Sequence, residues 1–275
     1  MKKPMISTKG LDFGVCNICG DSGKLTEDHT PPKKCIRITQ VELFHIIDHL
    51  DALGQREKIH NKGRRLMNGV KYKTLCEPCN SKYLGSLYDP AFIYFVNTVG
   101  EFLKSTLILP RMIPITIEPQ KIMRSLIGHL SAQGVNRYKK GENTIPIKDY
   151  ILNSSKSLPE DLNIYYWLYP YKYYLMARDF GYLDTRDGKS CAMWLIKFFP
   201  IAFLVTFAKP EEWGFHVNEL SLYRDKPIDY KAKEYISLTN IPHPMWPEAP
   251  SDENHNVVLY GQEAITSYEL KPKRR

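Results

Sequence analysis

The sequence lacks an uninterrupted apolar segment long enough to cross a membrane, and it lacks a recognisable signal peptide. The two most apolar segments, 91–109 and 191–208, carry charged residues near their centres: Glu101 and Lys104 in the first, Lys197 in the second. A membrane helix needs about 20 consecutive apolar residues, and the opening MKKPMISTKG is not followed by an apolar run. We therefore expect a cytoplasmic protein without membrane contact, whose cysteines are reduced thiols or metal ligands.

Internal repeats, low-complexity segments and a glycine-rich phosphate-binding loop are also missing. Hydrophobic residues make up 43% and charged residues 25% of the 275 positions, which excludes a disordered or fibrous chain. There are 38 basic and 30 acidic residues, and residues 1–90 alone contain 15 basic and 10 acidic ones. This excess permits a polyanionic partner and is densest in the first third of the chain.

Only six cysteines are present, and four of them form two pairs of identical spacing. Cys16 and Cys19 make the first pair, and Cys76 and Cys79 the second. A Cys-x-x-Cys pair in a tight turn directs two thiolates at one ion, so two pairs predict a closed four-sulfur zinc site. The alternative is one redox motif with a second pair by chance, which the duplication disfavours. We interpret the isolated Cys35 and Cys191 as packed thiols.

Each cysteine pair is followed by polar residues of the kinds that bind metal ions or take part in catalysis. The segment 25–32 reads LTEDHTPP and the segment 75–85 reads LCEPCNSKYLG. If the two pairs share one ion, they hold the end of a strand that carries Asp28 and His29 against a helix that begins near Asn80. These three residues would then lie in one cleft.

As a set, these motifs resemble the HNH endonucleases, in particular the zinc-knuckle subgroup with Asn directly after the last cysteine. The resemblance covers roughly residues 14–90. It implies the ββα-metal (His-Me finger) fold with a treble-clef zinc site, and it implies metal-dependent hydrolysis of DNA phosphodiester bonds. The implied setting is bacterial or phage, in restriction or anti-phage (antiviral) defence.

The resemblance also implies a role for each motif residue. His29 is expected to be the general base, with Asp28 and Asn80 as ligands of a catalytic divalent ion such as Mg²⁺, Mn²⁺ or Ni²⁺. Imidazole supplies a base near neutral pH, and oxygen ligands suit a hard cation that neutralises phosphate charge. The asparagine that orients the base is either Asn68 or Asn61. The structural zinc is implied to bind Cys16, Cys19, Cys76 and Cys79.

Basic residues around these motifs are candidates for phosphate contacts, with a solvated loop face as the alternative. They are Lys33, Lys34, Arg64, Arg65 and Lys82. DNA is the expected partner, although RNA stays open, as do an activating partner protein and a homo-oligomer. A different class of function also stays open: a non-catalytic zinc-finger module that binds nucleic acid or serves as a partner subunit.

The rest of the pattern predicts an α+β protein. We expect a nuclease domain over residues 1–90 and, over 91–275, an α+β domain for recognition, sensing or oligomerisation. Apolar spacing predicts helices over 41–53, after a capping box at Thr39, over 90–107 with Asp89 as N-cap, and from Pro119 to about 134. Short apolar and aromatic runs predict strands of a largely antiparallel sheet at 164–169, 171–177, 192–199, 201–208, 256–260 and 264–270.

Overall fold

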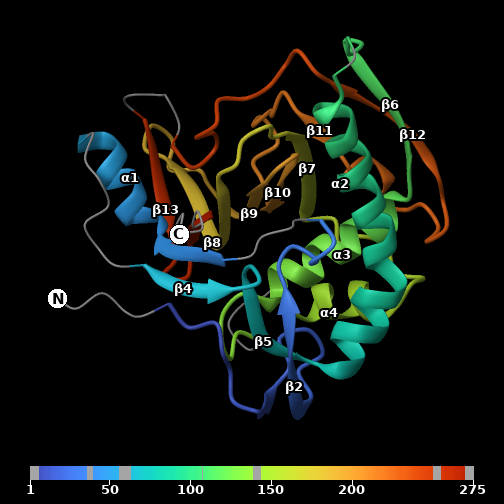
Figure 1. The fold of residues 1–275 in the computed structure, drawn as a ribbon, viewed down its shortest axis with the longest axis vertical. Coiled ribbons are helices and arrows are strands. Elements are labelled where there is room, and N and C mark those ends of the chain that lie inside the picture. The colour runs from blue at the N-terminus through green and yellow to red at the C-terminus, as the bar shows by residue number, and fades with distance from the viewer. Residues whose placement is uncertain are drawn as a thin grey trace, which may run out of the picture.

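The computed structural model describes residues 6–35, 40–55, 63–106, 108–138, 144–249 and 255–269. Its described strands form three antiparallel sheets, and helices pack between and beside them (Figure 1). The α+β class with antiparallel sheets is therefore confirmed. None of the described helices has the length and hydropathy to cross a membrane.

A three-stranded sheet, called the small sheet below, lies at the bottom of Figure 1. Its strands are β1 (Phe13–Val15), β2 (Ser22–His29) and β5 (Lys71–Cys76), in the order β1-β2-β5. A bulge between Thr26 and Glu27 interrupts the pairing of β2 with β5. Directly after β5 comes the π-helix η1 (Pro78–Tyr88), and α2 (Asp89–Lys104) and α3 (Pro119–Ala132) follow.

The nine-stranded sheet combines strands from both ends of the chain. Its central strands are β7 (Leu162–Leu168), β10 (Ile201–Phe207), β9 (Ser190–Phe198) and β8 (Tyr174–Asp184), with β11 (Asn218–Glu219) at one edge and β13 (Asn256–Tyr260) beside β8. Beyond β8 the order continues with β14 (Ile265–Glu269), β3 (Gln40–His45) and β4 (Arg64–Met67). The six strands expected between 164 and 270 are thus confirmed. Because β3 and β4 come from the segment between the cysteine pairs, this sheet includes residues from both sides of position 90, and a domain boundary there stays a prediction.

The helix expected over 41–53 is only partly confirmed. Residues 40–45 form β3, and α1 extends over Ile46–Gln55. Val41 and Leu43 are fully buried with the half-buried Glu42 between them, which is the two-residue period of a strand. Pairing of β3 with β14 decides the backbone here. The capping-box prediction was therefore wrong, although Thr39 itself lies outside the described residues.

The helices after the second cysteine pair are confirmed as α2 and α3, with one difference at the start of α2. Tyr88 occupies the N-cap position, and Asp89 is the first helical residue. Asp89 does not cap its own helix, because its carboxylate is bonded elsewhere, as described below. The remaining described elements are α4 (Thr144–Leu152), the short 3-10 helix η2 (Ser221–Tyr223) and a two-stranded sheet of β6 (Met112–Ile117) and β12 (Ala232–Ser237).

The nine-stranded sheet is covered by apolar residues on both faces. On one face Tyr166 packs with Phe95 and Phe203 in a core that also contains the cysteine pairs and most of α2 and α3. On the other face Tyr165 and Trp167 belong to a second cluster. The aromatic run at 165–174 therefore serves both cores. The strands on either side of Pro170, β7 and β8, are not neighbours, because β10 and β9 lie between them.

Candidate functional site

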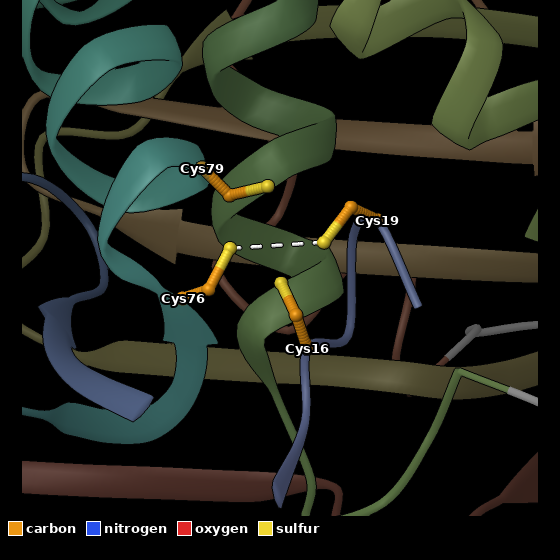
Figure 2. Close-up of side chains that lie close together, drawn as sticks. All are labelled: Cys16, Cys19, Cys76 and Cys79. Carbon is orange, nitrogen blue, oxygen red and sulfur yellow. Dashed lines mark hydrogen bonds between the residues drawn. The ribbon is translucent and has the colours of Figure 1, made fainter. Parts of the chain in front are cut away.

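The four paired cysteines come together at one point of the small sheet. Cys16 and Cys19 lie in the turn after β1, Cys76 ends β5, and Cys79 lies in the first turn of η1. Their sulfur atoms all lie within 4.8 Å of one another and point toward a common centre (Figure 2). The Cys19 and Cys76 sulfurs are 3.7 Å apart. A tetrahedral zinc ion with Zn–S bonds of about 2.3 Å requires sulfurs roughly 3.8 Å apart, so the cluster fits a structural zinc ion.

The electrostatics of the cluster favour a metal ligand set. Hydrogen bonds from the Cys76 and Cys79 thiols lower the pKa of Cys16 to about 2, whereas burial raises the pKa of Cys19 to about 12. Four sulfurs this close together, three of them on buried cysteines, cannot all carry negative charge without a cation to balance them. All four positions are occupied by protein sulfur, which is the closed arrangement of a structural zinc site.

Asn80 joins the start of η1 to the end of β2. Its Nδ2 donates hydrogen bonds to Thr26 Oγ1 at 2.9 Å and to the Glu27 carbonyl at 3.0 Å. That carbonyl belongs to the peptide linking Glu27 to Asp28, so the Asn80 amide lies one peptide unit from the Asp-His pair. The bonds use the nitrogen side of the amide and leave Oδ1 without a hydrogen bond to the described residues.

Asp28 points into the protein and is only 4% exposed. Its Oδ2 lies 2.8 Å from Nδ1 of His129, near the end of α3, and 3.5 Å from the Thr30 hydroxyl. The other ring nitrogen, His129 Nε2, lies 2.9 Å from Asp89 Oδ1. Ser125 donates its hydroxyl hydrogen to the same Asp89 oxygen at 2.7 Å. We name Asp28, His129, Asp89 and Ser125 the Asp28–His129 network.

The Asp28–His129 network holds a charged imidazole in the interior. Burial by itself would lower the pKa of His129, but the carboxylates of Asp28 and Asp89 outweigh it and raise this pKa to about 10. Burial acts to raise the pKa of Asp89, yet His129 more than offsets it and the pKa lies below its usual value. A buried cation between two carboxylates fixes the Asp28 side chain in place.

His29 lies on the opposite side of β2 from Asp28 and is half-buried. Its Nε2 is shielded from solvent and makes no hydrogen bond with the described residues. It borders a cavity of about 20 Å³ that is also lined by Asn68, Lys33 and Tyr174, a volume sufficient for one water molecule. Burial, followed by the nearby charge of Lys71, lowers the pKa of His29.

The structure thus brings some of the sequence-predicted residues together and separates others. Asn68 lies in the turn before β5, with φ of 62°, beside His29; Asn61 falls outside the described residues. Lys33, Lys34 and Lys82 are exposed near the motif. Arg64 and Arg65 lie on β4 of the large sheet, where Arg64 donates to the Ile6 carbonyl at 2.6 Å and Arg65 lies 3.8 Å from Glu42.

Sequence reasoning missed His129, Asp89 and Ser125 as residues of this site. The pattern of the resemblance includes an Asp a few residues after Gly85, and Asp89 is otherwise predicted as a helix cap, whereas His129 lies on a helix whose apolar face dominates its pattern. No local spacing links the three to Asp28; only the packing of α3 against β2 and η1 does.

Comparisons of the chain with protein-family models, with curated proteins and with solved structures found no match.

Proposed function

We propose that this protein is a metal-dependent endonuclease of the HNH type that hydrolyses phosphodiester bonds in DNA. The observation that carries the proposal is the bonding of Asn80 to β2 immediately before Asp28 and His29. This contact joins the two motifs of the resemblance beside a four-cysteine cluster that fits structural zinc.

In this proposal each side chain has one task. Asp28 and Asn80 supply oxygen ligands, because the bonds made by Asp28 Oδ2 and Asn80 Nδ2 leave Asp28 Oδ1 and Asn80 Oδ1 for that purpose. A bound Mg²⁺, Mn²⁺ or Ni²⁺ ion would neutralise charge on the phosphate and on the departing 3′ oxygen. Oxygen ligands of this kind suit a hard divalent cation.

His29 is the proposed general base. Its lowered pKa keeps the imidazole neutral at physiological pH, so that Nε2 can accept a proton. The cavity that His29 borders is large enough for one water molecule. Deprotonated water attacks phosphorus as the bond from phosphorus to the 3′ oxygen breaks, and the departing oxygen takes up a proton from solvent, so that the products carry 5′-phosphate and 3′-hydroxyl ends. Asn68, which borders the same cavity, is the proposed residue for orienting the base; Asn61 lies outside the described residues.

Substrate binding is proposed to use the exposed lysines near the motif. Lys33 and Lys34 follow the Asp-His pair, and Lys82 projects from η1. Arg64 is a weaker candidate, because its guanidinium already binds the Ile6 carbonyl.

Cleavage of supercoiled plasmid tests the proposal. Wild type is compared with His29→Ala and with the matched control His216→Ala, an exposed histidine outside the site, at equal zinc content and with Mg²⁺, Mn²⁺ or Ni²⁺. We expect metal-dependent nicking by wild type and by the control, and a loss of at least about 100-fold in His29→Ala, the usual contribution of a general base. Full activity in His29→Ala would refute the assigned mechanism.

A non-catalytic nucleic-acid-binding module is the second candidate. The observation in its favour is that Asp28 Oδ2 and Asn80 Nδ2 are both engaged in bonds that a purely structural role would also use. If wild type binds a DNA duplex without cleaving it, and His29→Ala binds with the same affinity, this second function is the correct one.

A further inference from the structure

A cavity lies away from His29, between the first cysteine pair, the end of α3, the start of α4 and the β8–β9 hairpin. Its volume is about 520 Å³, which is within the range of sites that hold small organic molecules. Asn17, from the turn between Cys16 and Cys19, forms part of its wall, as do Ser131 of α3 and Thr144 of α4. Neither the zinc cluster nor the Asp28–His129 network uses this space.

Arg178 brings a buried positive charge to the cavity. It is 8% exposed, and burial lowers the pKa of its guanidinium to about 10. Nη1 donates to the carbonyls of Ser131 at 2.9 Å and Gln133 at 3.2 Å. Nε and Nη2 make no hydrogen bond, and the group forms no ion pair, within the described residues. The negative end of α3 offsets part of this charge, but a buried cation is ordinarily matched by an anion.

A second guanidinium borders the same space. Arg137 forms ion pairs with Asp179 and, at 3.7 Å, with Glu263, yet its Nε is buried and makes no hydrogen bond in the described part of the chain. Asp179 follows Arg178 directly in sequence, but its carboxylate pairs with Arg137. Arg178 therefore forms no ion pair with the described side chains, although the charges of Asp179 and Glu263 act on it from a greater distance.

The remaining walls are largely aromatic. The Arg178 guanidinium lies 4.9 Å from the centre of the Trp194 ring, and Phe207 lies 4.9 Å from Trp194 on the same wall. Tyr182 and Tyr260 also border the cavity. Aromatic walls favour a flat ring, and a guanidinium favours phosphate or carboxylate. We propose that this cavity binds a small planar anion: an aromatic ring of nucleobase size that carries a phosphate or a carboxylate group.

The cavity is connected to the proposed catalytic site through α3. Ser131, whose carbonyl accepts hydrogen bonds from both Arg178 and Asn17, lies two residues after His129. Asn17 also accepts a hydrogen bond from the Arg137 backbone N–H at 3.1 Å. A ligand that draws Arg178 away from Ser131 would act on the helix end that positions His129, and on the turn that carries Cys16 and Cys19.

Calorimetric titration of the full-length, zinc-loaded protein tests the binding site without reference to nuclease activity. The probes are AMP and 1-naphthoate, which distinguish phosphate from carboxylate, and adenosine and 1-naphthamide as their uncharged counterparts. We expect at least one anionic probe to bind with Kd below about 1 mM, and its uncharged counterpart to bind at least about 10-fold more weakly. No saturable binding of either anion, or equal binding of the uncharged counterpart, overturns the proposal.

Two variants locate the bound probe. Arg178→Met removes the charge and is expected to weaken binding of the anion at least 10-fold, whereas Arg186→Met, at an exposed arginine of the β8–β9 turn, leaves it unchanged. Trp194→Phe keeps an aromatic wall and is expected to retain binding while the ligand-induced change in tryptophan fluorescence disappears. This second variant keeps the test decisive if Arg178→Met fails to fold. A fluorescence change that persists in Trp194→Phe places the ligand elsewhere and refutes the site.

Discussion

The position of Asp28 is determined by a residue that lies far along the chain. His129 holds Asp28 Oδ2 at 2.8 Å and is itself held at 2.9 Å by Asp89. Side chains at the end of a strand are often exposed and mobile. Here, one oxygen of the Asp28 carboxylate is held by the buried His129 ring. Preorganisation of this kind is what a catalytic metal ligand needs, because the other oxygen then has a defined direction.

Removal of the central imidazole should destabilise the protein strongly. In His129→Ala, Asp28 and Asp89 are left buried without their cation, and breaking a buried ion pair in this way costs about 3–5 kcal/mol. Ser125→Ala removes one hydrogen bond to Asp89 and should cost only about 0.5–1.5 kcal/mol. Urea unfolding of both variants measures the difference. Equal, small effects in the two variants would mean that His129 does not carry the charge that we assign to it.

His49 should make the stability of the protein depend on pH. It is buried on α1, its ring stacks on Tyr173 with 4.8 Å between ring centres, and burial together with the charge of Lys197 lowers its pKa to about 4. Between pH 6.5 and 4 the unfolded chain binds a proton at this residue that the folded chain does not. The free energy of unfolding should therefore fall on acidification, by up to about 1.4 kcal/mol per pH unit from this group.

The contribution of His49 to the pH dependence of stability is measured by comparing variants. Urea unfolding between pH 4 and pH 7 is compared for wild type, His49→Gln and the exposed control His216→Gln. We expect the His49→Gln curve to be flatter than wild type over this range, and the control to parallel wild type. Parallel curves for all three proteins would contradict the assigned pKa.

At the residue scale, the sequence predicts a site where the residues that form it are close together in the sequence. The Cys-x-x-Cys spacing predicts a sulfur cluster because each pair fits one turn, and the cysteines indeed meet. His129 could not be predicted, because its partner Asp28 is brought to it only by the packing of α3. The role of Asp89 was misread for the same reason: its position before Pro90 suits a cap, but Ser125 and His129 compete for its carboxylate.

At the scale of elements, β3 shows how tertiary pairing overrides a local helical pattern. The apolar residues of 41–53 fit a helix, yet residues 40–45 also alternate, and main-chain bonds to β14 favour the strand. From α2 onward the predicted helices and strands lie close to where the pattern places them, whereas β6, α4 and β12 were not predicted. Pairing partners were not predictable, since β7 and β8 are adjacent in sequence but separated in the sheet by two strands.

The four-cysteine cluster joins a turn, a strand end and a helix start, so loss of a zinc ion bound there should loosen all three. Cys79→Ser removes one of the four sulfurs, and because binding of structural zinc contributes directly to folding, we expect the variant to lose both zinc and thermal stability. Cys191→Ser is the matched control, at a buried thiol outside the cluster. Elemental analysis of the purified proteins should find one zinc per chain in wild type and in the control. A zinc-free wild type, or a Cys79→Ser variant with full zinc content, would contradict the assignment.

At the scale of the whole molecule, the small sheet depends on α3 for its core and its hydrogen bonds. Asn17 Nδ2 donates to the Gly134 carbonyl at 2.7 Å, and the Thr74 hydroxyl donates to the Ala132 carbonyl at 2.7 Å. Gly128 packs so closely on η1 that an added Cβ would lie 2.3 Å from Leu84 Cδ2. On the other side, β3 depends on β14 for its pairing. The motifs of residues 1–90 are local in sequence, but the surfaces that complete them come from beyond residue 104.

We therefore expect a fragment of residues 1–90 not to fold by itself, even with zinc. Without α3 it exposes the buried side chains of Leu75, Leu84 and Tyr72, and Asp28 loses His129. Circular dichroism during urea titration, with one equivalent of zinc, should show a cooperative transition for the full chain and none for the fragment. A cooperative, zinc-dependent transition in the fragment would instead establish residues 1–90 as a domain. The contacts of α3 would then be an interface between domains, and the control of Asp28 by His129 would be exerted across it.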